Sequence, residues 1–150
     1  MYIIEKLKEG TETGEIINFI AIDSNKSHSI GILRIGNQNI GFKWRGTNPE
    51  LFEIPGFELL AIHADFSIII LSTITGDLKL KIGIEFEFVE FKLENYSLLI
   101  VTELMITIIN LNSLSISKIV SIPDIIIDID IVADTIFIKT LDGKYEKHLY

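Results

Sequence analysis

Short runs of apolar residues at a spacing of two recur along the chain, and polar clusters separate them. Isoleucine occurs 32 times and, together with Val, Phe, Tyr and Thr, makes up most of these runs. Alternation at a period of two is typical of β-strands. A sustained period of 3.6 residues, which would indicate amphipathic helices, is nearly absent. The pattern therefore predicts an all-β protein.

The apolar runs and the turns between them predict a series of short strands. Strands are expected near residues 2 to 8, 15 to 23, 29 to 36, 39 to 45, 58 to 64, 67 to 74, 78 to 84, 86 to 92, 97 to 102, 105 to 111, 115 to 121, 125 to 132, 135 to 140 and 144 to 149. Asn, Asp and Gly, which tolerate the positive φ of hairpin turns, occupy many of the connections. Because the connections are short, sequential strands should pair antiparallel as meanders. Only the connection at residues 45 to 56 is long enough for an irregular excursion.

Three successive segments share one order of elements, namely strand, polar turn, apolar strand, second turn and strand. They are residues 57 to 82, 89 to 119 and 126 to 149. This rhythm resembles the blades of β-propellers over about two thirds of the chain. A closed propeller needs at least four blades of about 40 residues, or about 160 residues in total. We therefore expect antiparallel meanders that form a β-sandwich or flattened barrel within a single all-β domain of residues 1 to 150.

Charge is unevenly distributed along the sequence. The net charge is −8, and residues 1 to 50, 51 to 100 and 101 to 150 contribute 0, −5 and −3. An acidic surface repels nucleic acids and anionic membranes and attracts a basic partner. The simpler interpretation is solubility, because net charge keeps an apolar domain from associating. Mean hydropathy is +0.41, so both interpretations stay open.

The composition also excludes several kinds of chemistry. The chain has no cysteine, which excludes disulfides, thiolate metal sites and cysteine nucleophiles. The first residues lack the apolar core of a secretory signal, and no uncharged stretch is long enough to span a bilayer. These features are compatible with a cytoplasmic protein, which we expect.

Four aspartates stand among isoleucines and valines in residues 122 to 134. On a strand, alternation puts the odd-numbered isoleucines, from Ile125 to Ile131, on a core face and Asp128 and Asp130 on the wetter face. Two carboxylates bind a hard cation only if further oxygens converge, and no Asp-x-Asp-x-Asp-Gly loop supplies them. The remaining interpretations are a solvated face or a surface for a partner.

A second acidic run spans residues 84 to 94, with the sequence IEFEFVEFKLE. Glu85 and Glu87 alternate with phenylalanines, and the apolar phase then slips by one residue. The slip predicts a bulge near Val89 and Glu90. Carboxylates on such a strand either protect a sheet edge from aggregation or form a docking surface.

The segment FKWRGTNPELFEIPGFELL carries the only tryptophan, Trp44. Trp and Arg are common in the energetic centres of interfaces. We expect Trp44 and Phe57 to lie in the core and the polar residues around them to be exposed. Together with the acidic runs, the candidate partner-binding residues are Arg45, Asn48, Glu50, Glu53, Glu85, Glu87, Glu90, Asp128 and Asp130.

Catalytic motifs are absent from the sequence. No nucleophile elbow, P-loop or Gly-x-Gly-x-x-Gly motif occurs. His63 lies two residues from Asp65, an arrangement that suits an acid–base pair but more often orders a turn. No histidine has metal-ligand spacing to another. We therefore expect a protein without enzymatic activity, cofactor or metal.

In size, acidity, Ile-rich composition and lack of catalytic motifs, the chain resembles the small acidic immunity proteins of bacterial toxin systems, including those of contact-dependent growth inhibition. The resemblance implies a cytoplasmic inhibitor that blocks the active site of a basic toxin, for example a nuclease encoded by the adjacent gene. The acidic charge leads us to expect neither a nucleic acid nor a membrane as partner. The alternatives are a small-molecule-binding β-sandwich and a structural module.

Overall fold

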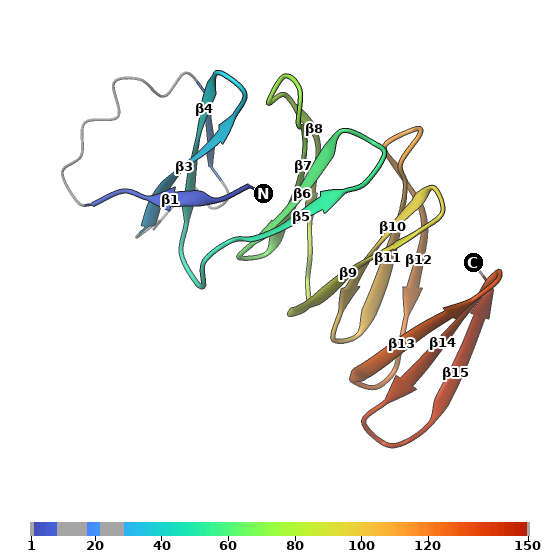
Figure 1. Cartoon of the computed structure of the whole chain (residues 1–150). Coiled ribbons are helices and arrows are strands. Elements are labelled where there is room, and N and C mark those ends of the chain that lie inside the picture. The colour runs from blue at the N-terminus through green and yellow to red at the C-terminus, as the bar shows by residue number, and fades with distance from the viewer. Residues whose placement is uncertain (1, 9–17, 22–28, 150) are drawn as a thin grey trace. The chain divides into compact units, whose positions relative to one another are not determined.

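The computed structural model describes residues 2–8, 18–21 and 29–149, which form fifteen β-strands (Figure 1). The all-β prediction is confirmed. Within these residues there is no helix, and so none long and apolar enough to cross a membrane. The chain divides into two compact units, Met1–Gly83 and Ile84–Tyr150. The single domain of residues 1 to 150 stays a prediction.

Unit 1 contains two four-stranded sheets. The first sheet has the order β1 (Ile4–Lys6), β3 (Ser29–Ile35), β4 (Gln38–Trp44) and β2 (Asn18–Ala21). β2 runs parallel to β4, whereas the other neighbours are antiparallel. The second sheet is a meander of β5 (Glu50–Ile54), β6 (Leu59–Ala64), β7 (Ser67–Ser72) and β8 (Leu78–Gly83).

The core of unit 1 lies between these two sheets. Alternate side chains of β3 and β4 meet alternate side chains of β6 and β7. The buried cluster contains Leu33, Ile35, Ile40, Phe42, Trp44, Leu60, Ile62, Ala64, Ile69 and Leu71. Burial of each Leu, Ile or Phe contributes about 1.5–3 kcal/mol. The two facing sheets give unit 1 the sandwich-like arrangement that the sequence predicts, and Trp44 belongs to its core as expected. Phe57, also expected in the core, is half-buried and is not part of this cluster.

Unit 2 repeats the meander twice. One sheet comprises β9 (Phe88–Glu94), β10 (Ser97–Thr102), β11 (Met105–Asn110) and β12 (Ser115–Ser121), with β9 and β12 at its edges. The other comprises β13 (Ile126–Val132), β14 (Thr135–Thr140) and β15 (Tyr145–Leu149). The core between the two sheets contains Leu99, Val101, Ile106, Ile108, Val120, Ile122, Ile126, Ile129, Ile136 and Ile138.

The hairpin between β14 and β15 shows how turn residues set strand register. The Gly143 N–H donates to Thr140 O, and the Thr140 N–H donates to Lys144 O, both at 3.0 Å. Gly143 has φ of +82°, which an L side chain rarely adopts. This is a type I turn followed by a glycine bulge, a common three-residue hairpin loop. Thr140 and Lys144 therefore form the first hydrogen-bonded pair of the hairpin.

The structure corrects the expected excursion over residues 45 to 56. Residues 45–49 are irregular, β5 occupies Glu50–Ile54, and residues 55 and 56 belong to the β5–β6 turn. β5 pairs antiparallel with β6 along its whole length. The two prolines that flank this stretch, Pro49 and Pro55, mark its ends rather than an absence of strand, because proline is tolerated at strand termini.

The isoleucine face expected in β13 is also corrected. Ile126 is buried, whereas Ile125 and Ile127 are 38% and 49% exposed. The pairing with β14 shifts register between Ile126 and Asp128, so Ile127 bulges out of the strand. Because of the bulge, an even-numbered isoleucine faces the core before Ile127 and an odd-numbered isoleucine faces it after Ile127. Beyond it the prediction is confirmed for Ile129, which is buried.

The bulge predicted in β9 is confirmed. Val101 pairs with Glu90 and Thr102 with Phe88, so Val89 is the extra residue. The phase slip lets the rings of Phe88 and Phe91 approach to 4.7 Å between centroids. Pairing with β10 ends at Phe88, because Thr102 is the last residue of β10. Glu85 and Glu87 consequently precede β9 instead of lying on it, which corrects their expected place.

Candidate protein-binding surface

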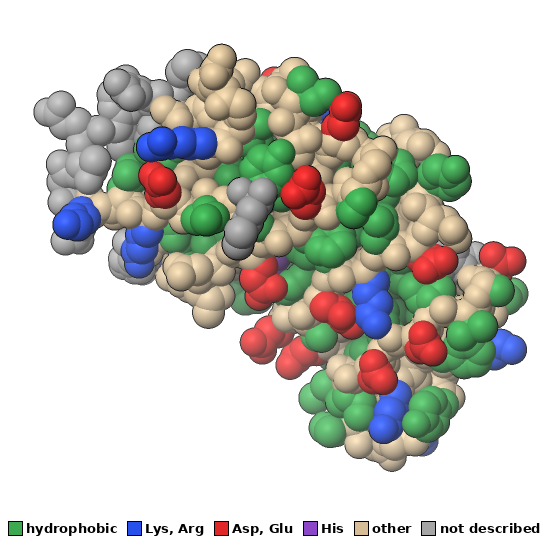
Figure 2. All heavy atoms as spheres, viewed as in Figure 1, with side chains coloured by type: hydrophobic (Ala, Val, Ile, Leu, Met, Phe, Trp, Pro, Cys, Tyr) green, Lys and Arg blue, Asp and Glu red, His purple; other side chains and the backbone are tan. Residues whose placement is uncertain are grey.

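The nine candidate residues fall into both units. Arg45, Asn48, Glu50 and Glu53 belong to unit 1, and Glu85, Glu87, Glu90, Asp128 and Asp130 belong to unit 2. All are exposed except Glu90, which is half-buried. Unit 2 carries eleven Asp and Glu against five Lys and Arg, a net charge of −6 out of the −8 of the chain. Acidic side chains on the surface are visible in Figure 2.

Three of the acidic candidates lie on two edge strands, and the side chain of Lys92 contacts both strands. β9 and β13 are edge strands of the two sheets of unit 2. The Lys92 ammonium of β9 lies 3.6 Å from Glu90 Oε1 and donates to the backbone oxygen of Ile129 in β13 at 2.6 Å. Asp128 and Asp130 flank Ile129 on that strand. We call Glu90, Asp128 and Asp130 the acidic edge of unit 2.

Backbone hydrogen bonds bring the segment before β9 to the start of β13. The Glu103 N–H donates to Glu87 O at 2.9 Å, and the Ile126 N–H donates to Glu103 O at 2.7 Å. Glu87, in the connection before β9, is thus linked through the backbone of Glu103 to Ile126, the first residue of β13. Glu103, which is half-buried in the turn between β10 and β11, was not predicted as a site residue. Its position in a two-residue turn between apolar strands was the available signal.

The acidic edge suits binding of cationic side chains better than binding of a metal ion. Asp128 pairs across the sheet with Lys139, and Asp130 pairs with Phe137, so neither faces a second carboxylate directly. Among the described residues, no group of three or more His, Asp or Glu side chains has the geometry to hold a metal. Exposed carboxylates of this kind accept charge-assisted hydrogen bonds from Arg and Lys.

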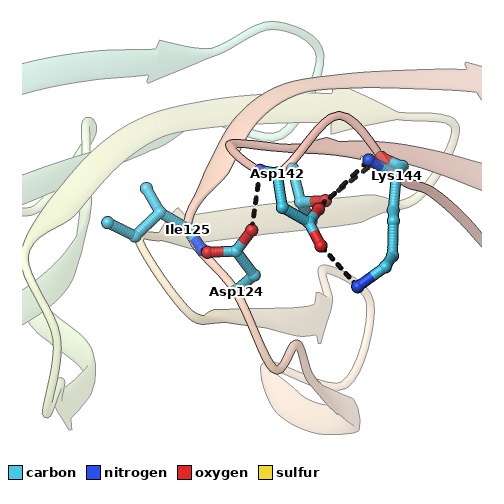
Figure 3. Close-up of polar contacts among 5 residues, drawn as sticks. Asp124, Ile125, Asp142 and Lys144 are labelled. Atoms are coloured by element: carbon cyan, nitrogen blue, oxygen red, sulfur yellow. Dashed lines mark hydrogen bonds and ion pairs between the residues drawn. The ribbon is translucent and has the colours of Figure 1, made fainter.

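Not every aspartate of unit 2 is available to a partner, as the β14–β15 turn shows (Figure 3). The Asp142 carboxylate accepts from Thr140 Oγ1 at 2.7 Å and from the Lys144 N–H at 3.1 Å, and it forms an ion pair with the Lys144 ammonium. The Lys144 side chain is the main reason that the pKa of Asp142 is held far below its ordinary value of 3.8.

A second aspartate ties this turn to the segment before β13. Asp124 Oδ2 accepts from the Asp142 N–H at 2.8 Å, and Asp124 Oδ1 accepts from the Ile125 N–H at 2.8 Å (Figure 3). The Leu141 N–H also donates to Ile125 O at 2.8 Å. The Asp124 and Asp142 carboxylates therefore stabilise the β14–β15 turn and the segment before β13.

In unit 1, the backbone of the loop that carries Arg45 is held by one carboxylate. Asp65, in the β6–β7 turn, accepts from the Arg45 N–H at 2.8 Å and from the Gly46 N–H at 2.7 Å. His63 Nε2 lies 2.9 Å from the backbone oxygen of Asp65. This contact helps to order the β6–β7 turn.

Two surface hollows of unit 1 include candidate residues. Asn48 lines one of about 310 Å³ together with Tyr2, Lys6 and Trp44. Trp44 is 1% exposed, and its Nε1 is buried without a hydrogen-bond partner. Glu53 lines the other, of about 380 Å³, beside the β5–β6 turn with Glu58 and Thr73. Both hollows are lined in part by charged side chains.

The geometry defines an all-β protein of antiparallel meanders with a carboxylate-lined strand edge. No protein-family model and no curated protein matches the chain. Several solved structures resemble the fold, including the following three. The computationally designed Ika4 protein has a TM-score of 0.54 at 9% identity, with 87% of this chain and 89% of that chain covered.

The other two structures are much longer than this chain. BBS1N in complex with ARL6DN has a TM-score of 0.53 at 8% identity, with 80% of this chain and 43% of that chain covered. BamB from Moraxella catarrhalis has a TM-score of 0.52 at 8% identity, with 83% of this chain and 38% of that chain covered. At such low identity, these likenesses show the fold alone.

Proposed function

We propose that the protein is a binding protein without catalytic activity, namely an immunity-type inhibitor that docks its acidic surface onto a basic toxin. The partner would be a cationic protein encoded by the adjacent gene, for example a nuclease, and the complex would form in the cytoplasm. The carboxylates would occupy the place of substrate phosphates in the partner's active site. Neither nucleic acid nor membrane is a partner under this proposal.

The acidic edge is the observation that supports this proposal most strongly. Glu90, Asp128 and Asp130 come from two strand edges, and the Lys92 ammonium spans these edges by contacting Glu90 and Ile129 O. The excess negative charge of the chain is concentrated in the same unit, at −6. A field of one sign steers a partner of opposite charge and raises the association rate.

The alternative of a small-molecule-binding sandwich has less support. Such sites are concave, largely enclosed and mostly apolar, with a few polar groups that orient the ligand. The two hollows described above lie at the surface, and charged residues such as Lys6 and Glu53 line them.

Affinity purification of the protein with the product of the adjacent gene tests the proposal. We expect a stable complex with the wild type and a weaker one with Glu90→Gln/Asp128→Asn/Asp130→Asn. The matched control is Glu58→Gln/Asp77→Asn in unit 1, which removes exposed carboxylates elsewhere and should leave binding nearly unchanged. Absence of any complex with wild-type protein, or an equal loss in both variants, would contradict the proposed role of the acidic edge.

A further inference from the structure

The sheet of β13, β14 and β15 has one strand fewer than the two meanders before it. The sheets of β5–β8 and β9–β12 each contain four consecutive strands, whereas this sheet contains three described strands. Among the described strands, β15 pairs only with β14. One edge of β15 therefore has no neighbouring strand in the part of the chain that the structure describes.

The hydrogen-bonding phase of the hairpin shows which backbone groups face that edge. Thr140 and Lys144 form a hydrogen-bonded pair, and such pairs alternate with non-hydrogen-bonded pairs along an antiparallel ladder. The N–H and C=O groups of Tyr145, Lys147 and Leu149 consequently point away from β14. In agreement, Leu149 O accepts a hydrogen bond from the Lys118 ammonium of β12.

The same three residues place their side chains on one face of the sheet. Tyr145 and Leu149 are 71% and 70% exposed, more than any other large apolar side chain among the described residues. Lys147 stands between them, and its ammonium lies 5.7 Å from the ring centroid of Phe137 on β14. The open edge thus presents an apolar, a cationic and an apolar side chain in alternation.

We propose that β15 is a docking site for an extended segment of another protein, which adds to the sheet as a fourth, antiparallel strand. Strand addition supplies affinity through main-chain hydrogen bonds and specificity through alternate side chains. The segment would carry a carboxylate opposite Lys147 and apolar side chains two residues to each side, opposite Tyr145 and Leu149. Directly opposite residues of opposite charge favour such pairing.

Lys147 favours a strand with an acidic centre over a second copy of the chain. If β15 paired with β15 of another copy in full two-fold register, Lys147 would stand opposite Lys147 of that copy. Like charges directly opposite each other destabilise a pair of strands, and an edge lysine is a common means of preventing self-association. A strand with an acidic centre removes that repulsion.

This site is separate from the acidic edge. Asp128 and Asp130 lie on β13, at the opposite edge of the same sheet, and Glu90 lies on β9 of the other sheet of unit 2. Strand addition at β15 therefore does not depend on the proposed toxin partner, and each proposal can fail alone.

A fluorescein-labelled peptide, Thr-Val-Thr-Glu-Thr-Val-Thr, tests strand addition by fluorescence anisotropy on the full chain. We expect saturable binding to the wild type and binding about threefold to tenfold weaker to Lys147→Glu. A peptide with Lys at its centre should show the reverse preference. Lys139→Glu, on the same face but on the central strand β14, is the matched control and should leave binding of both peptides nearly unchanged.

Amide hydrogen exchange then locates the bound strand. The peptide should protect the amides of Tyr145 and Lys147, while those of Glu146 and His148 are already protected by β14. The proposal is overturned if the wild type shows no saturable binding, if binding is indifferent to the charge reversal, or if the Tyr145 and Lys147 amides gain no protection. Concentration-dependent protection of these amides without peptide would instead assign the edge to a second copy.

Discussion

At the residue scale, the carboxylates of this protein serve two different purposes. Asp65 and Asp142 accept hydrogen bonds from backbone N–H groups and hold turns in place. Asp128 and Asp130 are exposed on an edge strand, and Asp130 Oδ1 also accepts from the Ile131 N–H at 2.9 Å. Only the second kind adds to a surface that a partner can bind, so the count of acidic residues overstates the available binding charge.

The role of Asp142 predicts a pH dependence of stability. Because the pKa of Asp142 is lowered in the folded protein, mainly by Lys144, its contribution is present in full above its ordinary pKa and fades as the pH falls below that value. Asp142→Asn should therefore lower the urea midpoint at pH 7 and have a smaller effect at pH 3. The difference between the effects of Asp142→Asn at the two pH values should be smaller when Lys144 is replaced by Met. A pH-independent effect of Asp142→Asn would contradict this role.

Gly31 and Gly83 form a matched pair for testing the packing of unit 1. A Cβ on Gly31 would lie 2.6 Å from Ile4 Cγ2 and 2.9 Å from the Trp44 ring, whereas a Cβ on Gly83 would meet no atom within 4 Å. Gly31→Ala should destabilise the protein by about 1–3 kcal/mol through overpacking. Gly83→Ala should be neutral or stabilise by up to about 1 kcal/mol, because alanine restricts the unfolded chain. Urea unfolding measures the stability of both variants. Equal losses of stability in Gly31→Ala and Gly83→Ala would contradict this packing.

At the scale of elements, alternation identified most of the strands, and bulges limited which faces could be assigned. The bulge at Val89 left a trace in the sequence because Phe88 and Phe91 change parity. The bulge at Ile127 left none, because isoleucines occupy both parities there. A bulge is detectable from sequence only when the residues on either side of it differ in polarity.

The candidate residues were predicted as exposed or acidic positions, but their grouping was not. Glu90 and β13 are brought together by Lys92, whose contact with Ile129 O joins residues 37 apart in sequence. β5 was missed because its prolines suggested an irregular loop. Strand pairing across such distances depends on the tertiary fold, and single-sequence periodicity does not reveal it.

The hydrogen bonds between the Asp65 carboxylate and the loop after β4 can be tested by substituting Asp65. Asp65→Ala removes the acceptor of the Arg45 and Gly46 N–H groups, so these two amides should exchange faster by about tenfold or more, in keeping with loss of hydrogen bonds worth about 1–3 kcal/mol. Asp65→Asn, which retains one carbonyl acceptor, should have a smaller effect. Unchanged exchange at both amides in Asp65→Ala would show that the loop holds its conformation without this carboxylate.

At the scale of the whole molecule, the charge is segregated between two units of similar architecture. Each unit packs two sheets around its own apolar cluster, so the fold does not require unit 2 to be acidic. Unit 2 nevertheless carries −6 of the −8 charges. Self-repulsion of this kind opposes folding slightly, and a partner of opposite charge would relieve it.

If the acidic edge recognises cationic side chains and not a metal, divalent cations should leave stability nearly unchanged. A ligand that does not bind the folded state adds nothing to its stability. We expect millimolar Ca²⁺ or Mg²⁺ to shift the melting temperature by no more than the same ionic strength of NaCl. A specific rise of several degrees that disappears in Asp128→Asn would reveal a cation site.

The most direct test of the proposed function is the salt dependence of association with the product of the adjacent gene. Surface charge acts mainly on the association rate, and salt screens it. Stopped-flow measurements at two salt concentrations should show that Glu85→Gln/Glu87→Gln/Glu90→Gln associates more slowly than the wild type and has a flatter salt dependence, while circular dichroism shows an intact fold. Equal rates and equal salt dependences would mean that these carboxylates do not steer association, and no binding by the wild type would contradict the immunity function itself.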